Sequence, residues 1–286
     1  MGIASFFRHK LKRDKKLLLV SLQEDLKKLE KELSKSKVIG IDTEFDWRTT
    51  YFPKLSIIQI STLKKKIIID CLKVNPKKIL KTFLENSEYL KIFHSVRSDS
   101  LVISKSLGIK TANVFDIQIA EKILTNRDIL AYSKIVKKYY GIKLNKSETN
   151  SNWLKRPLSE NQLKYAQEDV DFLIGIYRAQ KPLLRINNLE DKVKKLSERE
   201  ASLGNESLKK LRLQKNEKKL SHRGKKIFLW REETAEEENI PPGYIFKDKF
   251  LKKLSEIAHG DPLARKKIIS MIGNTKTAEK FIMDLL

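Results

Sequence analysis

The sequence contains few of the residues that build soft metal sites. It has one cysteine, Cys71, and four histidines in 286 residues. A single cysteine excludes a disulfide within the chain and a zinc site built from several thiolates. The histidines lie far apart, at positions 9, 94, 222 and 259. A histidine-based metal cluster is therefore not expected, and any bound metal would be held by oxygen atoms.

Long apolar runs are also absent. No stretch of the sequence has the length and apolar character of a transmembrane helix. The apolar run at 17–20 is too short for a signal peptide. We therefore expect a cytoplasmic protein without a membrane partner. An organelle transit segment stays open, because no acidic residue precedes Asp14.

Negative charge is scarce relative to positive charge. The chain holds 60 Lys and Arg against 36 Asp and Glu, which gives a formal net charge of +24 and a pI near 9.8. Such an excess favours a polyanionic partner, and nucleic acid is favoured over a membrane because no apolar or amphipathic anchor accompanies it. The alternative is a lysine-rich proteome that raises the pI of every protein it encodes.

The order of the apolar patterns predicts an α/β domain followed by a small all-α module. Residues 15–35 are typical of an amphipathic helix, and short Ile-rich strands then precede several helical patterns. We expect a mixed-sheet domain at 1–180 and a helical module at 222–286. Residues 181–226 contain fifteen Lys and Arg against six Asp and Glu, and we interpret 181–221 as a basic helical linker.

The segment KVIGIDTEF, residues 37–45, combines a strand pattern with two carboxylates. Side chains alternate along a strand, so Asp42 and Glu44 share one face with Gly40, a residue expected to leave open space. Thr43 and Phe45 belong to the other, core-like face. Two neighbouring carboxylates need water, a cation or a shared proton. A strand end with both acids in solvent remains the alternative.

Two further segments add carboxylates. In YAQED, Tyr165 and Asp169 lie four residues apart on one face of a helix that Ser159 is predicted to cap. In FHSVRSD, Asp99 stands at the start of an apolar helix, where a simple capping role would also explain it. Together these residues offer hard oxygen ligands suited to Mg²⁺ or Mn²⁺. Two such ions form the clamp used in phosphodiester hydrolysis, with a tyrosine available to orient or deprotonate the water.

These segments resemble the motifs of ribonuclease D, in the DEDDy class of 3′–5′ exonucleases. DTEF (42–45), HSVRSD (94–99) and YAQED (165–169) match the three exonuclease motifs in order. The resemblance covers about residues 20 to 180 and implies a ribonuclease H-like mixed sheet. It also implies two divalent ions, Mg²⁺ or Mn²⁺, and stepwise release of nucleoside 5′-monophosphates from RNA 3′ ends, with Tyr165 on the attacking water. The implied metal ligands are Asp42, Glu44, Asp99 and Asp169.

The C-terminal module is similar to an HRDC domain, a helical nucleic-acid-binding module, over residues 229–258. The expected partner is RNA with a structured 3′ end, such as a tRNA precursor, and no obligate protein partner is predicted. Lys146 and Arg156 are candidates for contacts with backbone phosphates. Phe45 and His94 are candidates for contacts with the terminal nucleotide. For each of these four residues a structural or solvent-exposed role is the alternative.

Two other functions remain open from the sequence. A 3′–5′ DNA exonuclease could use the same fold, because no motif here reports a dependence on the 2′-hydroxyl. A non-catalytic RNA-binding scaffold on a dead nuclease fold is the other. Such a scaffold is expected to lack a carboxylate, whereas all four carboxylates and the tyrosine are present.

Overall fold

The structure is a computed structural model that describes residues 15–286, and it divides into two compact units. Among the described residues, the first unit contains residues 15–46 and Lys54–Asn205. The second contains Trp47–Pro53 and Glu206–Leu286, so the loop after the strand with Asp42 and Glu44 is grouped with the C-terminal helices. Among the described helices, none has the length and apolar character that a membrane span needs.

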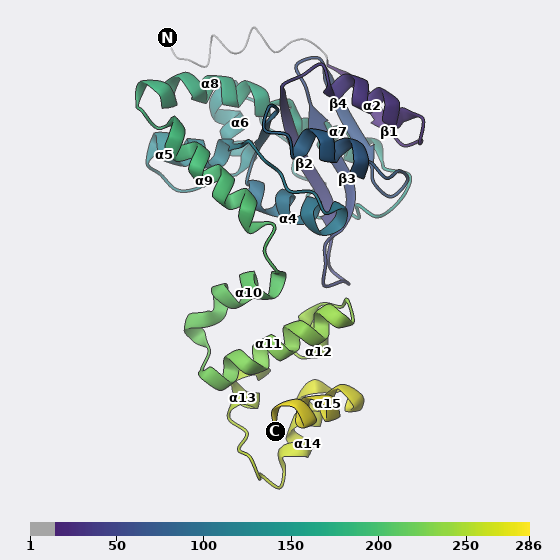
Figure 1. The fold of residues 1–286 in the computed structure, drawn as a ribbon, viewed down its shortest axis with the longest axis vertical. Coiled ribbons are helices and arrows are strands. Elements are labelled where there is room, and N and C mark those ends of the chain that lie inside the picture. Colours follow the sequence, from purple (N-terminus) through teal and green to yellow (C-terminus); the bar gives the residue numbers. More distant parts are fainter. Residues whose placement is uncertain (1–14) are drawn as a thin grey trace. The chain divides into compact units, whose positions relative to one another are not determined.

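A six-stranded mixed sheet organises the first unit (Figure 1), in the order β1-β4-β3-β2-β5-β6. Strand β3 runs antiparallel to both of its neighbours, β2 and β4. Strand β1 runs parallel to β4, and β5 runs parallel to both β2 and β6. This confirms the predicted mixed sheet. The strands are β1 Lys16–Val20, β2 Val38–Asp46, β3 Lys54–Ser61, β4 Lys65–Asp70, β5 Leu90–Phe93 and β6 Val114–Asp116.

Helices cover both faces of this sheet. On one face, Ile39 and Ile41 of β2 belong to a buried cluster with residues of helices α2, α3 and α4. On the other face, α7 contacts β2, β3 and β4, and α8 contacts β2 and β5. The helices of the first unit are α2 Asp25–Leu33, α3 Lys77–Leu84, α4 Val96–Leu107, α5 Ile117–Thr125, α6 Tyr132–Tyr140, α7 Glu160–Asp171, α8 Leu173–Ile186 and α9 Glu190–Leu203.

Two of the predicted helices begin later than expected. The helix predicted at 15–35 is wrong in its first part, because Lys16–Val20 forms β1 beside β4. Leu17 and Leu19 of this strand are exposed, so leucine on both faces hides the alternation that identifies a strand. Similarly, 114–116 forms β6, and Asp116 then caps α5 by accepting hydrogen bonds from the backbone N–H groups of Gln118 and Ile119.

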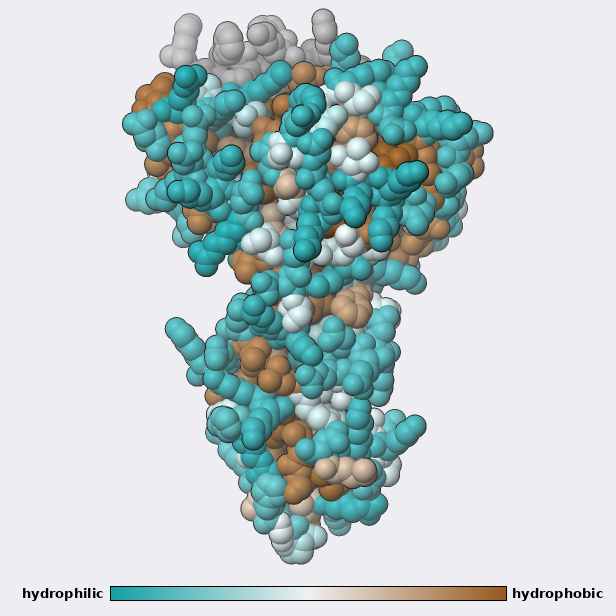
Figure 2. Space-filling model, viewed as in Figure 1, coloured by the Kyte–Doolittle hydropathy of each residue, from teal (hydrophilic) through white to brown (hydrophobic). Residues whose placement is uncertain are grey.

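The second unit is helical, as predicted. Its core includes Trp230 and Phe246, which pack edge-on against Phe281, and the Trp230 indole donates a hydrogen bond to Asp284 at 2.7 Å. The elements are α10 Leu208–Asn216, η1 Glu217–Lys219, α11 His222–Glu237, α12 Pro242–Ile245, α13 Phe250–Ser255, α14 Ala264–Ile272 and α15 Thr275–Leu285. Hydrophilic side chains cover most of the face shown in Figure 2, so much of the charge lies at the surface.

The segment predicted as a linker, 181–221, is largely helical and is divided between the two units. Helix α9 packs against α4 and β6, and a Cβ atom on Gly204 would lie 2.6 Å from the backbone nitrogen of Leu101. This close approach fixes the end of α9 on the first unit. Helix α10 instead contacts α11 in the second unit.

Candidate active site

Strand β2 presents Asp42 and Glu44 on the sheet face that α7 and α8 cover. The strand lies between β3 and β5, and both carboxylates are half-buried rather than free in solvent. The expectation that Gly40 leaves open space on this face is wrong. A Cβ atom there would lie 2.6 Å from Ser61 Oγ and 3.0 Å from Leu173 Cβ, so glycine allows α8 to approach the sheet closely.

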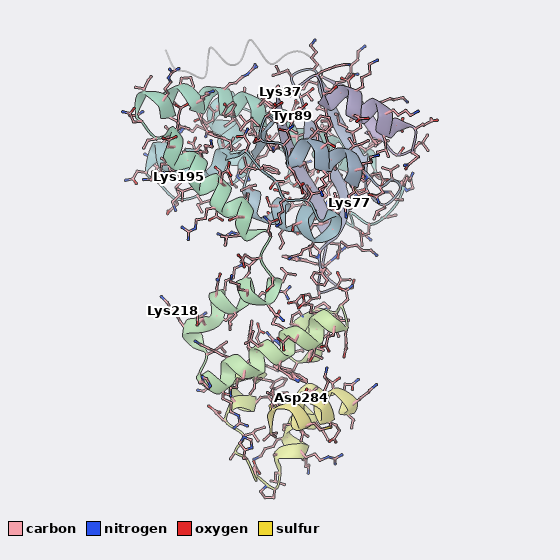
Figure 3. All side chains as sticks on the ribbon, viewed as in Figure 1. Lys37, Lys77, Tyr89, Lys195, Lys218 and Asp284 are labelled. Atoms are coloured by element: carbon pink, nitrogen blue, oxygen red, sulfur yellow. The ribbon has the colours of Figure 1, made fainter. Side chains whose placement is uncertain are left out.

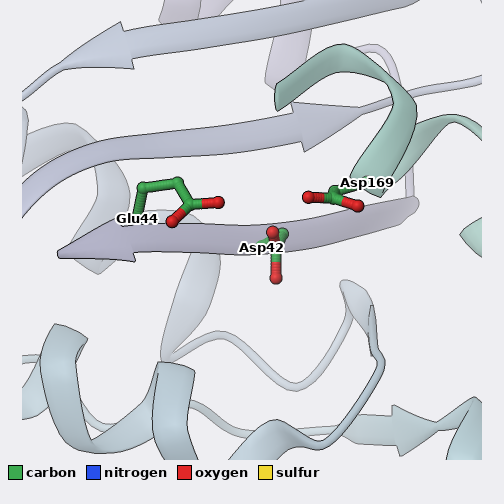
Figure 4. A group of neighbouring side chains, drawn as sticks. All are labelled: Asp42, Glu44 and Asp169. Atoms are coloured by element: carbon green, nitrogen blue, oxygen red, sulfur yellow. The ribbon is translucent and has the colours of Figure 1, made fainter. Parts of the chain in front are cut away.

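Helix α7 brings Asp169 to the two carboxylates of β2. Ser159 and Gln162 form a capping box at the start of this helix, which confirms the predicted N-cap. Asp42, Glu44 and Asp169 each offer a carboxylate oxygen, and these oxygens all lie within 4.8 Å of one another. Figure 4 shows the three side chains facing a common space between strand and helix.

Asp99 lies beside this group, on α4. Its Oδ1 accepts a hydrogen bond from Thr43 Oγ1 at 2.6 Å, across the face of β2 that packs on α4. Asp99 is buried and does not cap its helix, because the helix begins three residues earlier. The cap is supplied by Asp116, which accepts hydrogen bonds from the N–H groups of Ser95 and Val96 at 3.1 and 2.8 Å. Sequence reasoning missed this role of Asp116.

The four carboxylates hold their protons more tightly than ordinary acids. Burial, followed by the charges of Asp99, Asp169 and Glu44, raises the pKa of Asp42 well above its usual value. Burial raises the pKa of Glu44 to about 9, that of Asp99 to about 7 and that of Asp169 to about 6. Bringing four like charges together in a poorly solvated space is unfavourable without a cation.

All four carboxylates line one cavity of about 310 Å³. Phe45, His94 and Lys146 line it too. Phe45 reaches the cavity because a β-bulge between Glu44 and Phe45 interrupts the alternation that would place it wholly in the core. The Lys146 ammonium lies 5.9 Å from the ring centroids of both Tyr132 and Tyr165. Its charge partly offsets the effect of burial, which raises the pKa of Asp169 and Glu44. These three predicted contact residues therefore have access to a ligand in the cavity.

The hydroxyl group of Tyr165 is held near the carboxylates. It lies 3.2 Å from Thr149 Oγ1, and burial raises the pKa of Tyr165 above its usual value, so the phenol stays protonated. Tyr132 binds the C-terminal end of α7, the helix that carries Tyr165. Its hydroxyl donates a hydrogen bond to Glu168 O and accepts one from Phe172 N–H. No pattern in the sequence pointed to Thr149 or Tyr132, because their partners are distant in the chain.

Arg156, a predicted candidate for phosphate binding, is engaged by groups of the protein itself. Its Nε and one terminal nitrogen bind Asp70 at 2.7 and 2.8 Å. The remaining N–H groups donate to Ser56 and to the carbonyl oxygens of Trp153 and Lys155. With these donors engaged, Arg156 fastens the segment before α7 to strands β3 and β4.

We expect Arg156→Gln to destabilise the folded protein without weakening the contacts of the protein with RNA phosphates. The substitution leaves Asp70 buried without its partner, which costs about 3 kcal/mol of folding stability. The slope of log Kd against log salt for RNA should stay unchanged, because no phosphate contact is removed. Urea unfolding and RNA titrations at several salt concentrations measure both effects, with exposed Lys155→Gln as control. A shallower salt slope with unchanged stability would restore the phosphate role.

The donor set fits a hard divalent cation. The three grouped ligands are all carboxylates, and neither sulfur nor imidazole belongs to this group. A divalent ion would also offset the repulsion that raises the pKa values. Divalent metal binding therefore agrees with both the chemistry and the electrostatics of the cavity.

Comparison with known proteins identifies the class of protein to which this chain belongs. A family model described as 3′–5′ exonuclease matches residues 18–185, and a model of the HRDC domain matches residues 222–272. The fold is thus that of a 3′–5′ exonuclease domain followed by a helical HRDC domain. A ribonuclease D from Desulfotalea psychrophila is 31% identical over 280 residues, which cover 93% of this chain and 73% of the relative. The chain belongs to the ribonuclease D family.

Two further comparisons agree. A ribonuclease D from Bartonella henselae is 32% identical over 246 residues, covering 83% of this chain and 60% of that protein. The structure of Escherichia coli RNase D, described as an exoribonuclease involved in structured RNA processing, superposes with a TM-score of 0.81 at 22% identity. That alignment covers 94% of this chain and 73% of the other, and it confirms the predicted fold class.

Proposed function

We propose that this protein shortens RNA from the 3′ end and releases nucleoside 5′-monophosphates, with two Mg²⁺ or Mn²⁺ ions at the carboxylate site. The observation that carries the proposal is the group of carboxylate oxygens from Asp42, Glu44 and Asp169, within 4.8 Å of one another in one cavity. Asp99 lines the same cavity and raises the pKa of Asp42 and Glu44 through its charge, so we include it in the ligand set.

The residues that line the cavity have different roles in the proposed reaction. When bound, the divalent ions supply a nucleophilic water and neutralise charge on the phosphate. Tyr165 orients that water by donating a hydrogen bond, because its phenol stays protonated. Lys146 adds positive charge for the scissile phosphate, and Phe45 and His94 contact the terminal nucleoside. The His94 ring is fixed by a contact of 3.0 Å between Nε2 and Leu130 O.

We expect Tyr165→Phe to lower kcat about 10²-fold, the lower end of the effect of a group that positions a proton in the transition state. The ring keeps its packing against Trp153, so the fold should be retained. Single-turnover cleavage of a 5′-labelled RNA measures the rate, and the thermal shift with Mg²⁺ reports metal binding. Full activity in Tyr165→Phe would remove the hydroxyl from the mechanism.

The physiological substrate is proposed to be RNA with a structured body and an unpaired 3′ tail, with tRNA precursors as the main example. The strong positive charge supports a polyanionic substrate, and the family supports RNA. The test is a gel assay of a 3′-tailed tRNA and a DNA strand of the same sequence, each 5′-labelled, with Mg²⁺, Mn²⁺ or EDTA. A metal-dependent ladder from the RNA 3′ end is expected. Shortening of DNA alone would instead make the protein a DNA exonuclease, and binding without cleavage would favour a scaffold.

A further inference from the structure

Asp99 reaches the carboxylate cavity from a different element than the other three acids. Asp42 and Glu44 come from β2 and Asp169 comes from α7, and their oxygens form the group within 4.8 Å. Asp99 lines the same cavity from the first turn of α4 and lies outside that group. The position of the Asp99 carboxylate relative to β2 therefore depends on how α4 is fixed against the strand.

Apolar packing alone does not orient this carboxylate. Val96, Val102 and Ile103 of α4 belong to the same buried cluster as the isoleucines of β2. Side chains fill the space between the sheet and the helices that cover it (Figure 3). Such apolar contacts hold α4 near the sheet, but they are non-directional. Setting the orientation of a carboxylate requires a directional contact as well.

The hydroxyl group of Thr43 makes a directional contact with Asp99. Its Oγ1 donates a hydrogen bond to Asp99 Oδ1 at 2.6 Å, and the two residues are only 5% and 3% exposed. Thr43 stands between Asp42 and Glu44 in the chain, and it lines the cavity as well. One hydrogen bond therefore ties Asp99 to the strand that carries two of the other acids.

The hydroxyl group is the feature that distinguishes position 43 from its neighbours on this face of β2. Ile39 and Ile41, which precede Thr43 on the same face, are aliphatic members of the buried cluster. Valine at position 43 would continue this pattern, and it differs from threonine mainly in lacking the hydroxyl group. A buried hydroxyl group is unfavourable unless it is hydrogen-bonded, and Asp99 is the partner of this one.

We propose that Thr43 is a positioning residue for the second of the two divalent ions. By holding Oδ1 of Asp99, its hydroxyl group orients the carboxylate so that Oδ2 is presented to the ion near Asp99. A hydrogen-bond partner behind a metal ligand typically changes metal affinity by about 10- to 100-fold. This inference rests on the proposed function, because it concerns the metal ions of the same site.

The test removes the hydroxyl group while keeping the shape of the side chain. Thr43→Val lacks the donor, and Thr43→Ser retains it. The matched control is Thr62→Val, because Thr62 is also buried, follows β3 and lies outside the cavity. The Thr62 hydroxyl accepts hydrogen bonds from the N–H groups of Lys64 and Lys65 instead. If Thr43→Val does not fold, Thr43→Ala takes its place in the comparison with Thr43→Ser.

The first readout is the binding of Mn²⁺ to the metal-free protein with a nucleoside 5′-monophosphate. Electron paramagnetic resonance measures the free ion, and a protein-free blank corrects for ions bound by the nucleotide. The wild type is expected to bind two ions. Thr43→Val should weaken the second ion about tenfold or more and leave the first within about twofold. Thr43→Ser and Thr62→Val should bind both ions like the wild type.

The second readout is the dependence of RNA shortening on Mn²⁺. In Thr43→Val the Mn²⁺ concentration for half-maximal rate should rise about tenfold, and saturating Mn²⁺ should restore kcat to within about threefold of the wild type. KM for RNA should stay unchanged, because the hydroxyl group contacts Asp99 rather than RNA. In an Asp99→Ala background, Thr43→Val should not weaken the remaining ion further, since the hydroxyl group acts through Asp99.

Unchanged Mn²⁺ binding in Thr43→Val would overturn the proposal. Equal weakening of both ions would also overturn it, because the hydroxyl group would then stabilise the whole site rather than Asp99. A further loss in the Asp99→Ala background would show that Thr43 acts through another residue. A wild type that binds two Mn²⁺ ions but does not shorten RNA would refute the proposed function, while the Mn²⁺ titrations would still decide the role of Thr43.

Discussion

Asp42→Asn is expected to lower the rate of RNA shortening by at least about 10³-fold, equivalent to about 4 kcal/mol of transition-state stabilisation. The substitution keeps the size of the side chain and removes one carboxylate from the cluster of Asp42, Glu44 and Asp169. Burial and three neighbouring carboxylates already disfavour the charged form of Asp42. The asparagine variant should therefore fold at least as well as the metal-free wild type.

Single-turnover kinetics with excess enzyme measure this effect without interference from product release. Glu160→Gln is a matched control, because it removes an exposed carboxylate from the first turn of α7, away from the cavity. It should retain the wild-type rate. Equal activity of Asp42→Asn and wild type at saturating Mg²⁺ would mean that the carboxylates do not perform the chemistry.

Mg²⁺ is expected to stabilise the protein, and more strongly at pH 8 than at pH 6. In the metal-free protein, Asp169, Asp99 and Glu44 have pKa values raised to about 6, 7 and 9. The folded state therefore binds more protons than the unfolded chain, and stability falls as the pH rises from about 4, the ordinary carboxyl range, through these values. A metal ion competes with those protons, so its binding tightens as the pH rises.

The size of the effect follows from mass action. At a hundred times its Kd, a ligand that binds only the folded state adds about 2.7 kcal/mol. For a domain of this size that raises Tm by roughly 5–10 °C. Differential scanning fluorimetry at pH 6 and pH 8, with Mg²⁺ or EDTA, measures it. The prediction fails if the shift is the same at both pH values, or if Asp42→Asn shows the full shift.

The clustered carboxylates Asp42, Glu44 and Asp169 were predictable because their placement depends on the regular geometry of a single strand or helix. Alternation along a strand places Asp42 and Glu44 on one face, and a four-residue helical spacing places Tyr165 and Asp169 together. Three such motifs in order then identified the family, which the comparisons confirm. The mixed sheet followed from short apolar strands, although β1 was hidden by its exposed leucines.

The roles of several other residues depend on contacts between segments that are distant in the chain, and a pattern in the sequence does not reveal such contacts. Arg156 looked free for a phosphate, but Asp70, 86 residues earlier in the chain, binds its guanidinium group. Thr43 looked like a core residue, yet its hydroxyl donates to Asp99, 56 residues away. Gly40 was expected to leave space, which Leu173 fills from α8. In each case tertiary packing, rather than local propensity, decided the role.

The most direct measurement of metal binding by these carboxylates is the anomalous diffraction of crystals grown with Mn²⁺ and a nucleoside 5′-monophosphate. Anomalous scattering locates manganese independently of any assumption about the reaction. We expect manganese bound to oxygens of Asp42, Glu44 and Asp169, with a second ion in the same cavity near Asp99. Crystals of a protein that shortens RNA, saturated with Mn²⁺ but with no manganese at these carboxylates, would contradict it.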